Sequence, residues 1–164
     1  MITRNAPYFK DELLPDGRPA PAPLRCTAER TVRFEEVDAL NIMWHGRYPS
    51  YLEDARTAFG EFYGFSYHDL YKAGYVVPVK QMGIDYVAPM RFGQTCRIIC
   101  NLHWTNAARL NFSYTIVDLS GKLLTTGYTV QLFLTRDLEL CMFKPDYAVD
   151  FCLRWEAGEL PGQV

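Results

Sequence analysis

The first clear alternation of apolar and polar positions lies at residues 27–35. Ala28, Arg30, Val32 and Phe34 share one face, and the positions between them are Glu29, Thr31, Arg33 and Glu35. A repeat of two residues is typical of a half-buried β-strand. We therefore predict a strand that ends between Glu35 and Asp38.

A helical repeat follows, from near Arg47 to Gly64. Pro49 falls in its first turn, where a missing N–H is harmless. The apolar positions are three and four residues apart, as on one face of a helix: Tyr48, Tyr51, Leu52, Ala55, Ala58, Phe59 and Phe62. Charged residues take much of the other surface: Glu53, Asp54, Arg56 and Glu61. A short second helix is expected at residues 67–73, closed by Gly74.

The rest of the chain is rich in β-branched and aromatic residues, which favour strands. Strands are predicted at residues 75–81, 83–88, 95–104, 110–119 and 123–135. The turn at residues 120–122 joins the last two as a hairpin. Residues 145–155 are expected to form a helix.

One strand, one long helix and then further strands predict an α+β fold, in which an antiparallel sheet buries the helix. The helix is apolar on more than one side, so the sheet must curl around it. A chain of 164 residues suits a single domain. We assign residues 26–155 to that domain, residues 1–25 to a Pro-rich N-terminal extension and residues 156–164 to a C-terminal tail.

Composition narrows the possible functions. The net charge is −2, and no run of Lys or Arg forms the basic stripe of a nucleic-acid binder. No stretch of about 18 apolar residues predicts a membrane span, and the first ten residues lack the features of a secretory signal. Scattered arginines would suffice for a small phosphorylated ligand: Arg56, Arg91, Arg97 and Arg109.

The five cysteines form no C-x-x-C pair and no zinc-like spacing, so no metal site is expected. Cys96 and Cys100 lie four residues apart in a predicted strand and point to one face. Reduced, mostly buried thiols are typical of a cytoplasmic protein, which is the compartment we expect.

Candidate chemistry gathers between the first strand and the long helix. Asp38 ends the strand, and His45 follows seven residues later, just before the helix. A helix N-terminus offers unpaired N–H groups and about half a positive charge. Such a terminus would stabilise the oxyanion that develops on a thioester carbonyl. A carboxylate opposite would attack that carbonyl or activate a water.

Residues 34–48, FEEVDALNIMWHGRY, resemble the strand–loop–helix signature of the hot-dog-fold acyl-CoA thioesterases related to 4-hydroxybenzoyl-CoA thioesterase. The similarity continues at residues 76–79, 84–93 and in the last two strands, and it covers about residues 27–148. The second, catalytic Asp of the family corresponds to Asp38. The first Asp is Glu36 here, which we expect to be a mild change.

The resemblance implies a hot-dog fold and a set of site residues. Asp38 would act as nucleophile or general base, and the backbone N–H of His45 would polarise the thioester carbonyl. The imidazole of His45 and the phenol of Tyr48 would line the pocket. Asn41 stands in the family's glycine pair and tolerates the left-handed turn, while Leu40 would narrow the acyl pocket.

The catalytic candidates are thus Asp38 and His45, and the substrate-binding candidates are Asn41, Trp44, Tyr48 and Arg91. Arg91 would contact a CoA phosphate or form a surface salt bridge. Aromatic residues such as Trp44 fit helix burial as well as substrate binding.

Each candidate also has a plainer interpretation. Asp38 before a turn is ordinarily a turn-former, and His45 alone would be a capping or packing residue. Glu53 occupies the position of the carboxylate used by a sister branch of hot-dog enzymes, and we expect a solvated or interfacial charge there. We interpret His68 and His103 as structural.

The sequence therefore predicts an acyl-CoA thioester hydrolase that needs no metal or redox cofactor. Hot-dog proteins generally form their pocket between two subunits, so a homodimer or homotetramer is expected. One alternative is a hot-dog dehydratase or hydratase that acts on hydroxyacyl thioesters, although its His with Asp or Glu motif is not found. The other alternative is a non-catalytic acyl-thioester-binding module, against which the retained Asp38 argues.

Overall fold

The structure is a computed structural model that describes residues 12–162. Residues 1–11 of the predicted N-terminal extension and residues 163–164 of the predicted tail lie outside the described residues.

Five antiparallel strands form the main sheet in the order β1-β4-β5-β6-β3. Their bounds are β1 (Leu24–Thr31), β3 (Val79–Tyr86), β4 (Thr95–His103), β5 (Arg109–Asp118) and β6 (Leu123–Leu132). Two short strands, β2 (Tyr75–Val76) and β7 (Leu134–Thr135), pair separately. The helices are α1 (Tyr48–Tyr63), α2 (Tyr67–Lys72) and α3 (Asp146–Glu156), with 3₁₀ turns η1 (Phe34–Glu36) and η2 (His45–Arg47).

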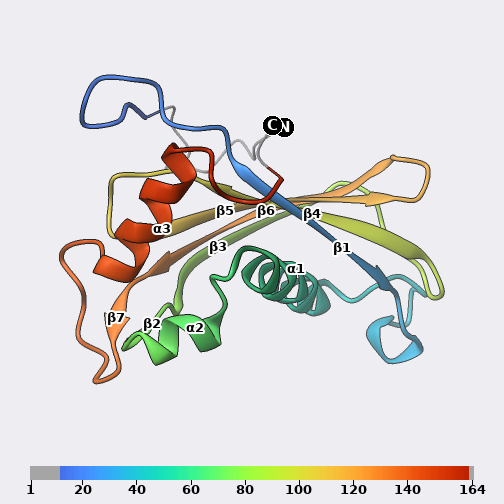
Figure 1. Ribbon diagram of the computed structural model, residues 1–164. Helices are drawn as coiled ribbons and strands as arrows, with labels where there is room; N and C mark the ends of the chain where they lie inside the picture. The colour runs from blue at the N-terminus through green and yellow to red at the C-terminus, as the bar shows by residue number, and fades with distance from the viewer. Residues whose placement is uncertain (1–11, 163–164) are drawn as a thin grey trace.

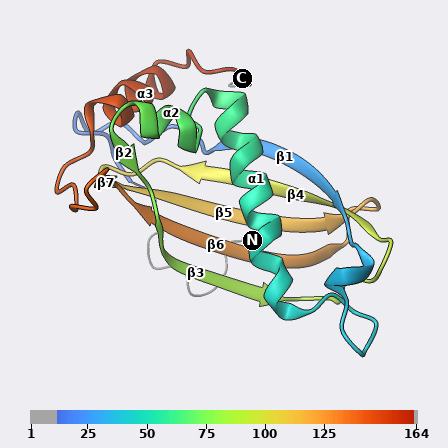
Figure 2. The same ribbon diagram turned by 90° about the horizontal axis from the view of Figure 1, so that it is seen from below.

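The long helix α1 lies across the concave face of the sheet, as Figures 1 and 2 show from two directions. Tyr51, Leu52 and Phe59 on α1 are at most 1% exposed. They share one core with side chains of the central strands such as Ile98 and Tyr114. This arrangement confirms the predicted α+β class, with an antiparallel sheet curled around one central helix.

Helix α3 and the described part of the Pro-rich segment cover the end of the sheet that lies away from the start of α1 (Figure 2). Phe151 of α3 stacks on Phe65, with ring centroids 4.3 Å apart. The indole N–H of Trp155 donates to the carbonyl oxygen of Ala22 at 3.0 Å. Leu14 is 6% exposed and belongs to the core. Within residues 12–162, the Pro-rich segment therefore packs against the domain.

The first strand differs from its prediction, because β1 ends at Thr31 rather than near Glu35. Val32 still pairs with the segment before β4, since its N–H donates to the carbonyl oxygen of Gln94 at 3.0 Å. The backbone then turns through η1, where Glu36 accepts a hydrogen bond from the N–H of Arg33 at 2.9 Å. A local side-chain acceptor thus ends the strand early.

The long helix begins and ends where predicted, and Gly64 closes it in the left-handed conformation with φ 66°. Two side chains lie on the opposite side from the prediction. Arg56 is 5% exposed, whereas Phe62 is 53% exposed. Arg56 is tolerated inside because it donates to the hydroxyls of Tyr67 at 2.9 Å and Tyr114 at 3.1 Å, which compensates for the lost water.

Two predicted strand boundaries are wrong. The break predicted near Met82 lies instead between β2 and β3, around Pro78, which has no N–H to donate to a ladder. Gly83 lies inside β3, where it makes room for the Tyr128 ring, since a Cβ at this position would come within 2.3 Å of that ring. The predicted strand at residues 123–135 is divided at Phe133, and its two parts pair in different sheets.

The remaining elements agree with their predictions. Strands β5 and β6 form the hairpin, whose turn includes Gly121 at φ 90°, and α3 forms at the expected position. All five cysteines are unpaired, and Cys96 and Cys100 both point into the core. Burial raises the pKa of the Cys96 thiol to about 11. None of the helices among residues 12–162 is long and apolar enough to cross a membrane.

The backbone of residues 65–66 passes so close to Gly60 of α1 that a larger side chain is not expected to fit there. A Cβ at this position would lie 2.7 Å from the Cα of Ser66 and 3.0 Å from the carbonyl oxygen of Phe65. Gly60→Ala should lower the free energy of unfolding by about 1–3 kcal/mol, because the chain after the helix must shift, although Ala favours helix by about 1 kcal/mol. Urea unfolding measures this change.

The exposed Thr57 on the same helix provides the matched control. Thr57→Ala should change the free energy of unfolding by less than about 0.5 kcal/mol. An unchanged or raised stability in Gly60→Ala would contradict the close packing of these segments.

Candidate active site

The loop between η1 and η2 is a closed hairpin that carries Asp38. The N–H of Asp38 donates to the carbonyl oxygen of Ile42 at 2.9 Å, and the N–H of Asn41 donates to that of Asp38 at 2.9 Å. Val37 and Met43 form an isolated antiparallel bridge. Asn41 has φ 59°, the left-handed region that Asn tolerates better than most residues. The side chain of Asn41 is exposed at the turn of this loop.

Only one of the two oxygens of the half-buried Asp38 carboxylate accepts a hydrogen bond from the loop. Its Oδ1 accepts a hydrogen bond from the N–H of Leu40 at 2.8 Å, the side-chain contact of an Asx-turn. Within residues 12–162, no hydrogen bond or ion pair involves the other oxygen, Oδ2. The turn-forming role therefore leaves one carboxylate oxygen available. The side chain of Leu40 is 72% exposed beside it.

Two backbone donors are open where the helix begins. Trp44 is the N-cap of η2 and provides no side-chain acceptor. Among the described residues, neither the N–H of His45 nor that of Gly46 donates a hydrogen bond. Because η2 continues directly into α1, these groups lie at the positive end of a long helix. The exposed His45 imidazole forms no hydrogen bond with Asp38.

The indole of Trp44 lies across the backbone of Gly46. A Cβ on Gly46 would come within 2.3 Å of the indole, so only glycine permits this arrangement. The Trp44 and His45 ring centroids are 5.0 Å apart, and the indole is 46% exposed. Aromatic surface of Trp44 therefore lies directly against Gly46, with the His45 ring next to it.

Tyr48 and Tyr86 pack against each other next to η2, and Tyr86 is hydrogen-bonded to it. Tyr48 is only 3% exposed, and burial raises the pKa of its hydroxyl. Its ring meets that of Tyr86 edge-on, with centroids 4.8 Å apart. The Tyr86 hydroxyl donates to the carbonyl oxygen of His45 at 3.1 Å. We did not predict a site role for Tyr86, since 41 residues separate it from His45 and only the fold brings them together.

Arg91 follows Met90, which contacts the Asp38 loop through a backbone hydrogen bond. The N–H of Met43 donates to the carbonyl oxygen of Met90 at 2.7 Å, while the backbone N–H of Arg91 is held by Gln94 at 3.0 Å. The Arg91 side chain is exposed and forms no ion pair with any residue between 12 and 162. The surface salt bridge considered for it is therefore absent from this part of the chain.

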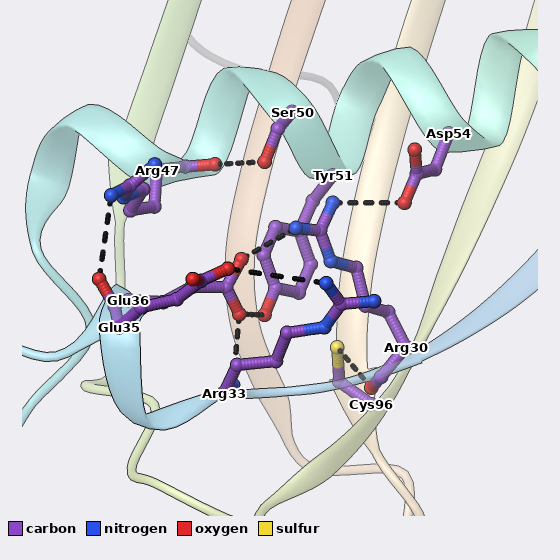
Figure 3. A network of polar contacts seen from close by, with 9 residues as sticks. All are labelled: Arg30, Arg33, Glu35, Glu36, Arg47, Ser50, Tyr51, Asp54 and Cys96. Atoms are coloured by element: carbon purple, nitrogen blue, oxygen red, sulfur yellow. Dashed lines mark hydrogen bonds and ion pairs between the residues drawn. The ribbon is translucent and has the colours of Figure 1, made fainter.

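A buried ion pair lies under the loop, and Figure 3 shows how its members converge. Glu36 is 2% exposed and accepts hydrogen bonds from Arg30 of β1 at 2.5 Å and from the Tyr51 hydroxyl of α1 at 2.8 Å. Burial alone would favour the neutral acid, but the Arg33 N–H, Tyr51 and Arg30 together hold the pKa of Glu36 below its ordinary value. Arg30 also pairs with Asp54 at 2.8 Å.

The sequence pattern contains little sign of this network, since it predicts Glu36 only as a mild replacement for the family's first Asp. The one available signal was Arg30, which falls on the apolar face of the first strand's alternation and so needs a partner inside.

The remaining candidates lie apart from the loop. Glu53 is 50% exposed and pairs with the buried Arg56. His68 is exposed on α2. His103 shares a hydrogen bond of 2.7 Å with the hydroxyl of Ser113, and burial lowers its pKa to about 4. Between residues 12 and 162, no group of three or more His, Cys, Asp or Glu side chains is arranged to hold a metal.

Comparison with known proteins identifies the family. The model of the thioesterase-like superfamily matches residues 32–150, so the chain belongs to this superfamily. YneP of Bacillus subtilis (strain 168), whose name assigns it provisionally to the acyl-CoA thioesterases, is 32% identical over 95 residues. That match covers 58% of this chain and 69% of YneP.

The acyl-CoA thioester hydrolase YbgC of Escherichia coli O157:H7 is 28% identical over 93 residues, which cover 57% of this chain and 69% of YbgC. Among solved structures, a DHNA-CoA thioesterase from Staphylococcus aureus has a TM-score of 0.72 at 24% identity, over 81% of this chain and 91% of that one. The similarity to this thioesterase structure confirms the hot-dog fold.

The environment of His103 predicts a specific pH dependence of stability. Its pKa is about 4 in the folded chain, against an ordinary value of 6.5. Between these values the unfolded chain binds the proton more readily, so stability must fall as the pH falls through this window. His103→Gln should remove about 2 kcal/mol of this loss, a value reduced for the partial exposure of the ring.

The measurement compares urea midpoints at pH 7.5 and pH 4.5 for both proteins. His68→Gln, at an exposed position, is the matched control and should behave like the wild type. Equal acid sensitivity in wild type and His103→Gln would show that the His103 ring is not protected from protonation.

Proposed function

We propose that the chain hydrolyses acyl-CoA thioesters and releases CoA and a carboxylate, with Asp38 as nucleophile or general base. One observation carries the proposal. A half-buried carboxylate, one oxygen of which has no partner within residues 12–162, lies on a closed hairpin loop, and two open backbone N–H groups follow directly after this loop at the helix start. The name of the relative YbgC, an acyl-CoA thioester hydrolase, supports the same reaction.

The chemistry follows from these two parts. A thioester carbonyl that accepts hydrogen bonds from the His45 and Gly46 N–H groups would become more electrophilic. As the carbonyl carbon is attacked, the oxygen gains negative charge, and one donor of this kind typically contributes about 10²–10³ in rate. Asp38 would attack the carbonyl directly, or would take a proton from the attacking water. After direct attack, the C–S bond breaks, the thiolate of CoA leaves and an anhydride remains on Asp38, which water then hydrolyses to the free carboxylate and Asp38. After attack by water, the C–S bond breaks to give the carboxylate directly, and the proton held by Asp38 passes to the thiolate.

We assign the neighbouring side chains to the substrate. Trp44 and the His45 imidazole would contact the thioester and the acyl group, since both are exposed beside the open N–H groups. Asn41 and Leu40 would limit the acyl pocket from the turn. Tyr48, which is buried, would form the floor of the site.

Arg91 would serve the CoA end of the substrate. Its guanidinium is exposed, has no ion-pair partner within residues 12–162 and lies one residue from the contact between Met90 and the loop. Arginine is well suited to phosphate, which it can bind with two parallel N–H donors.

Replacement of the acting carboxylate tests the reaction. Asp38→Asn keeps the shape and the Oδ1 acceptor but removes the charge, so kcat/KM should fall at least about 100-fold. Hydrolysis is followed by absorbance of the thioester bond for aromatic, short-chain and long-chain acyl-CoAs. This readout avoids thiol dyes, which would react with the five cysteines.

Glu35→Gln is the matched control, because this exposed carboxylate lies three residues before Asp38 and does not contact its loop through its side chain. It should retain wild-type activity. Residual activity above about a tenth of wild type in Asp38→Asn would remove Asp38 from the mechanism, because general acid–base groups contribute at least about 100-fold.

The wild-type protein distinguishes the alternatives. Tight binding of acyl-CoA without turnover would favour the acyl-thioester-binding module. Loss of water from a hydroxyacyl-CoA, with the thioester intact, would favour the dehydratase.

We further propose a homodimer or homotetramer in the cytoplasm. Strand β3 is an edge of the main sheet and offers unpaired backbone groups, a ready template for a second strand. Large side chains are exposed on and just after this edge: Val79, Tyr86 and Val87. Five unpaired thiols suit a reducing compartment.

Size-exclusion chromatography with light scattering measures the molar mass of the protein in solution and so tests the proposed assembly. We expect a mass two or four times that of one chain, with the same mass after dilution to the concentrations used for activity. A single-chain mass together with full activity would contradict a site formed between subunits.

A further inference from the structure

Glu36 joins three separate parts of the molecule through its side chain. The carboxylate accepts from Arg30 of β1 at 2.5 Å, from Tyr51 of α1 at 2.8 Å and from the N–H of Arg33 at 2.9 Å. With 2% exposure, it has no access to water that would replace a lost partner. The start of the loop is therefore fixed to both the sheet and the helix.

The backbone of the same residue holds the end of the loop. The carbonyl oxygen of Glu36 accepts from the N–H of Trp44 at 2.8 Å. Trp44 directly precedes the two open N–H groups at the helix start. Asp38 lies between these two fixed points, on the hairpin closed by the Val37–Met43 bridge. Movement of Glu36 would thus displace the carboxylate and the N–H donors relative to each other.

We propose that Glu36 is a positioning residue, whose buried pairing with Arg30 and Tyr51 holds the Asp38 loop and the His45 N–H in reactive geometry. This inference rests on the proposed function. Glu36 itself touches no substrate, because its carboxylate is buried and already accepts from three donors of the protein. A displacement of about 1 Å at a reacting group costs up to about 100-fold in rate, so such support matters to catalysis.

The second ion pair of Arg30, with Asp54, provides a control within the same network (Figure 3). Arg30 pairs with Asp54 at 2.8 Å, and the Asp54 carboxylate is 56% exposed. Asp54 lies on α1 and does not contact the loop. Glu36 and Asp54 therefore share a partner, but only Glu36 links that partner to Asp38.

The decisive variant is Glu36→Gln, which keeps the size of the side chain and removes its charge. We expect kcat to fall about 10- to 100-fold at a temperature well below Tm, while KM changes less than about threefold. Asp54→Asn, which also removes one ion pair from Arg30, should keep kcat within about twofold, as expected for an exposed pair. Glu36→Asp, which restores the charge on a shorter side chain, should recover part of kcat.

Hydrogen exchange of the loop provides a readout that does not require activity. The N–H groups of Asp38, Asn41 and Trp44 are all held by loop hydrogen bonds. In Glu36→Gln these amides should exchange at least about tenfold faster, as expected for local opening, while those of β4 and β5 remain unchanged. A role in global stability alone would accelerate all regions together.

Tyr51→Phe keeps the test valid if Glu36→Gln fails to fold. It removes one donor to Glu36 and retains the ring under Arg30, so a smaller loss of kcat with faster loop exchange is expected. Unchanged kcat and unchanged loop exchange in the folded variants would overturn the inference. If wild type turns over no acyl-CoA, the proposed function fails, and loop exchange then still decides whether Glu36 holds the loop.

Discussion

The burial of α1 against the sheet is the constraint on which the rest of the structure depends. Tyr51, Leu52 and Phe59 are almost fully removed from water, and burial of side chains of this size contributes about 1.5–3 kcal/mol each. One flat sheet face could not cover them, so the sheet curls around the helix. The ends of α1 then fall at the margins of the sheet, and its N-terminus opens toward the Asp38 loop (Figure 2).

Two arginines hold this helix through polar contacts, Arg56 from within the core and Arg30, whose side chain is 18% exposed, from β1. Arg56 donates to Tyr114 of β5, Tyr67 of α2 and, at 3.4 Å, Thr129 of β6, which fixes α1 along the sheet. Arg30 does the same between β1 and the loop through Glu36. A shift of α1 that broke the hydrogen bonds of Arg56, which is 5% exposed, would leave buried donors without partners at a cost of about 1–3 kcal/mol each. The apolar contacts of the helix would tolerate small displacements much better.

Local patterns predicted most of the elements, and long-range polar contacts explain most of the errors. The spacing of apolar residues and Gly64 were enough to delimit α1, because both signals lie within the helix. Arg56 was placed outside because nothing near it in sequence reveals Tyr114, which lies 58 residues away. The same reason kept Tyr86 out of the predicted site. The sequence motif selects Asp38 and His45 as candidates, but a pattern of residues contains no information about which oxygen of a carboxylate remains unpaired.

Glu36, at the start of the loop, and Asp38, within it, are two residues apart but differ in burial and in the number of hydrogen bonds that their carboxylates accept. Glu36 is buried and receives three donors, which satisfy its charge and leave it no capacity to act on a substrate. Asp38 is half-buried, and its carboxylate receives one donor among residues 12–162, the N–H of Leu40. A catalytic carboxylate must be held in place without being saturated, and two such demands conflict within a single side chain. In the proposed mechanism the two demands are divided between these neighbours, because Glu36 makes side-chain hydrogen bonds that fix the start of the loop to β1 and α1. Sites that contain pairs of acids in unlike environments commonly assign them unlike roles, and here the buried member is the one suited to support.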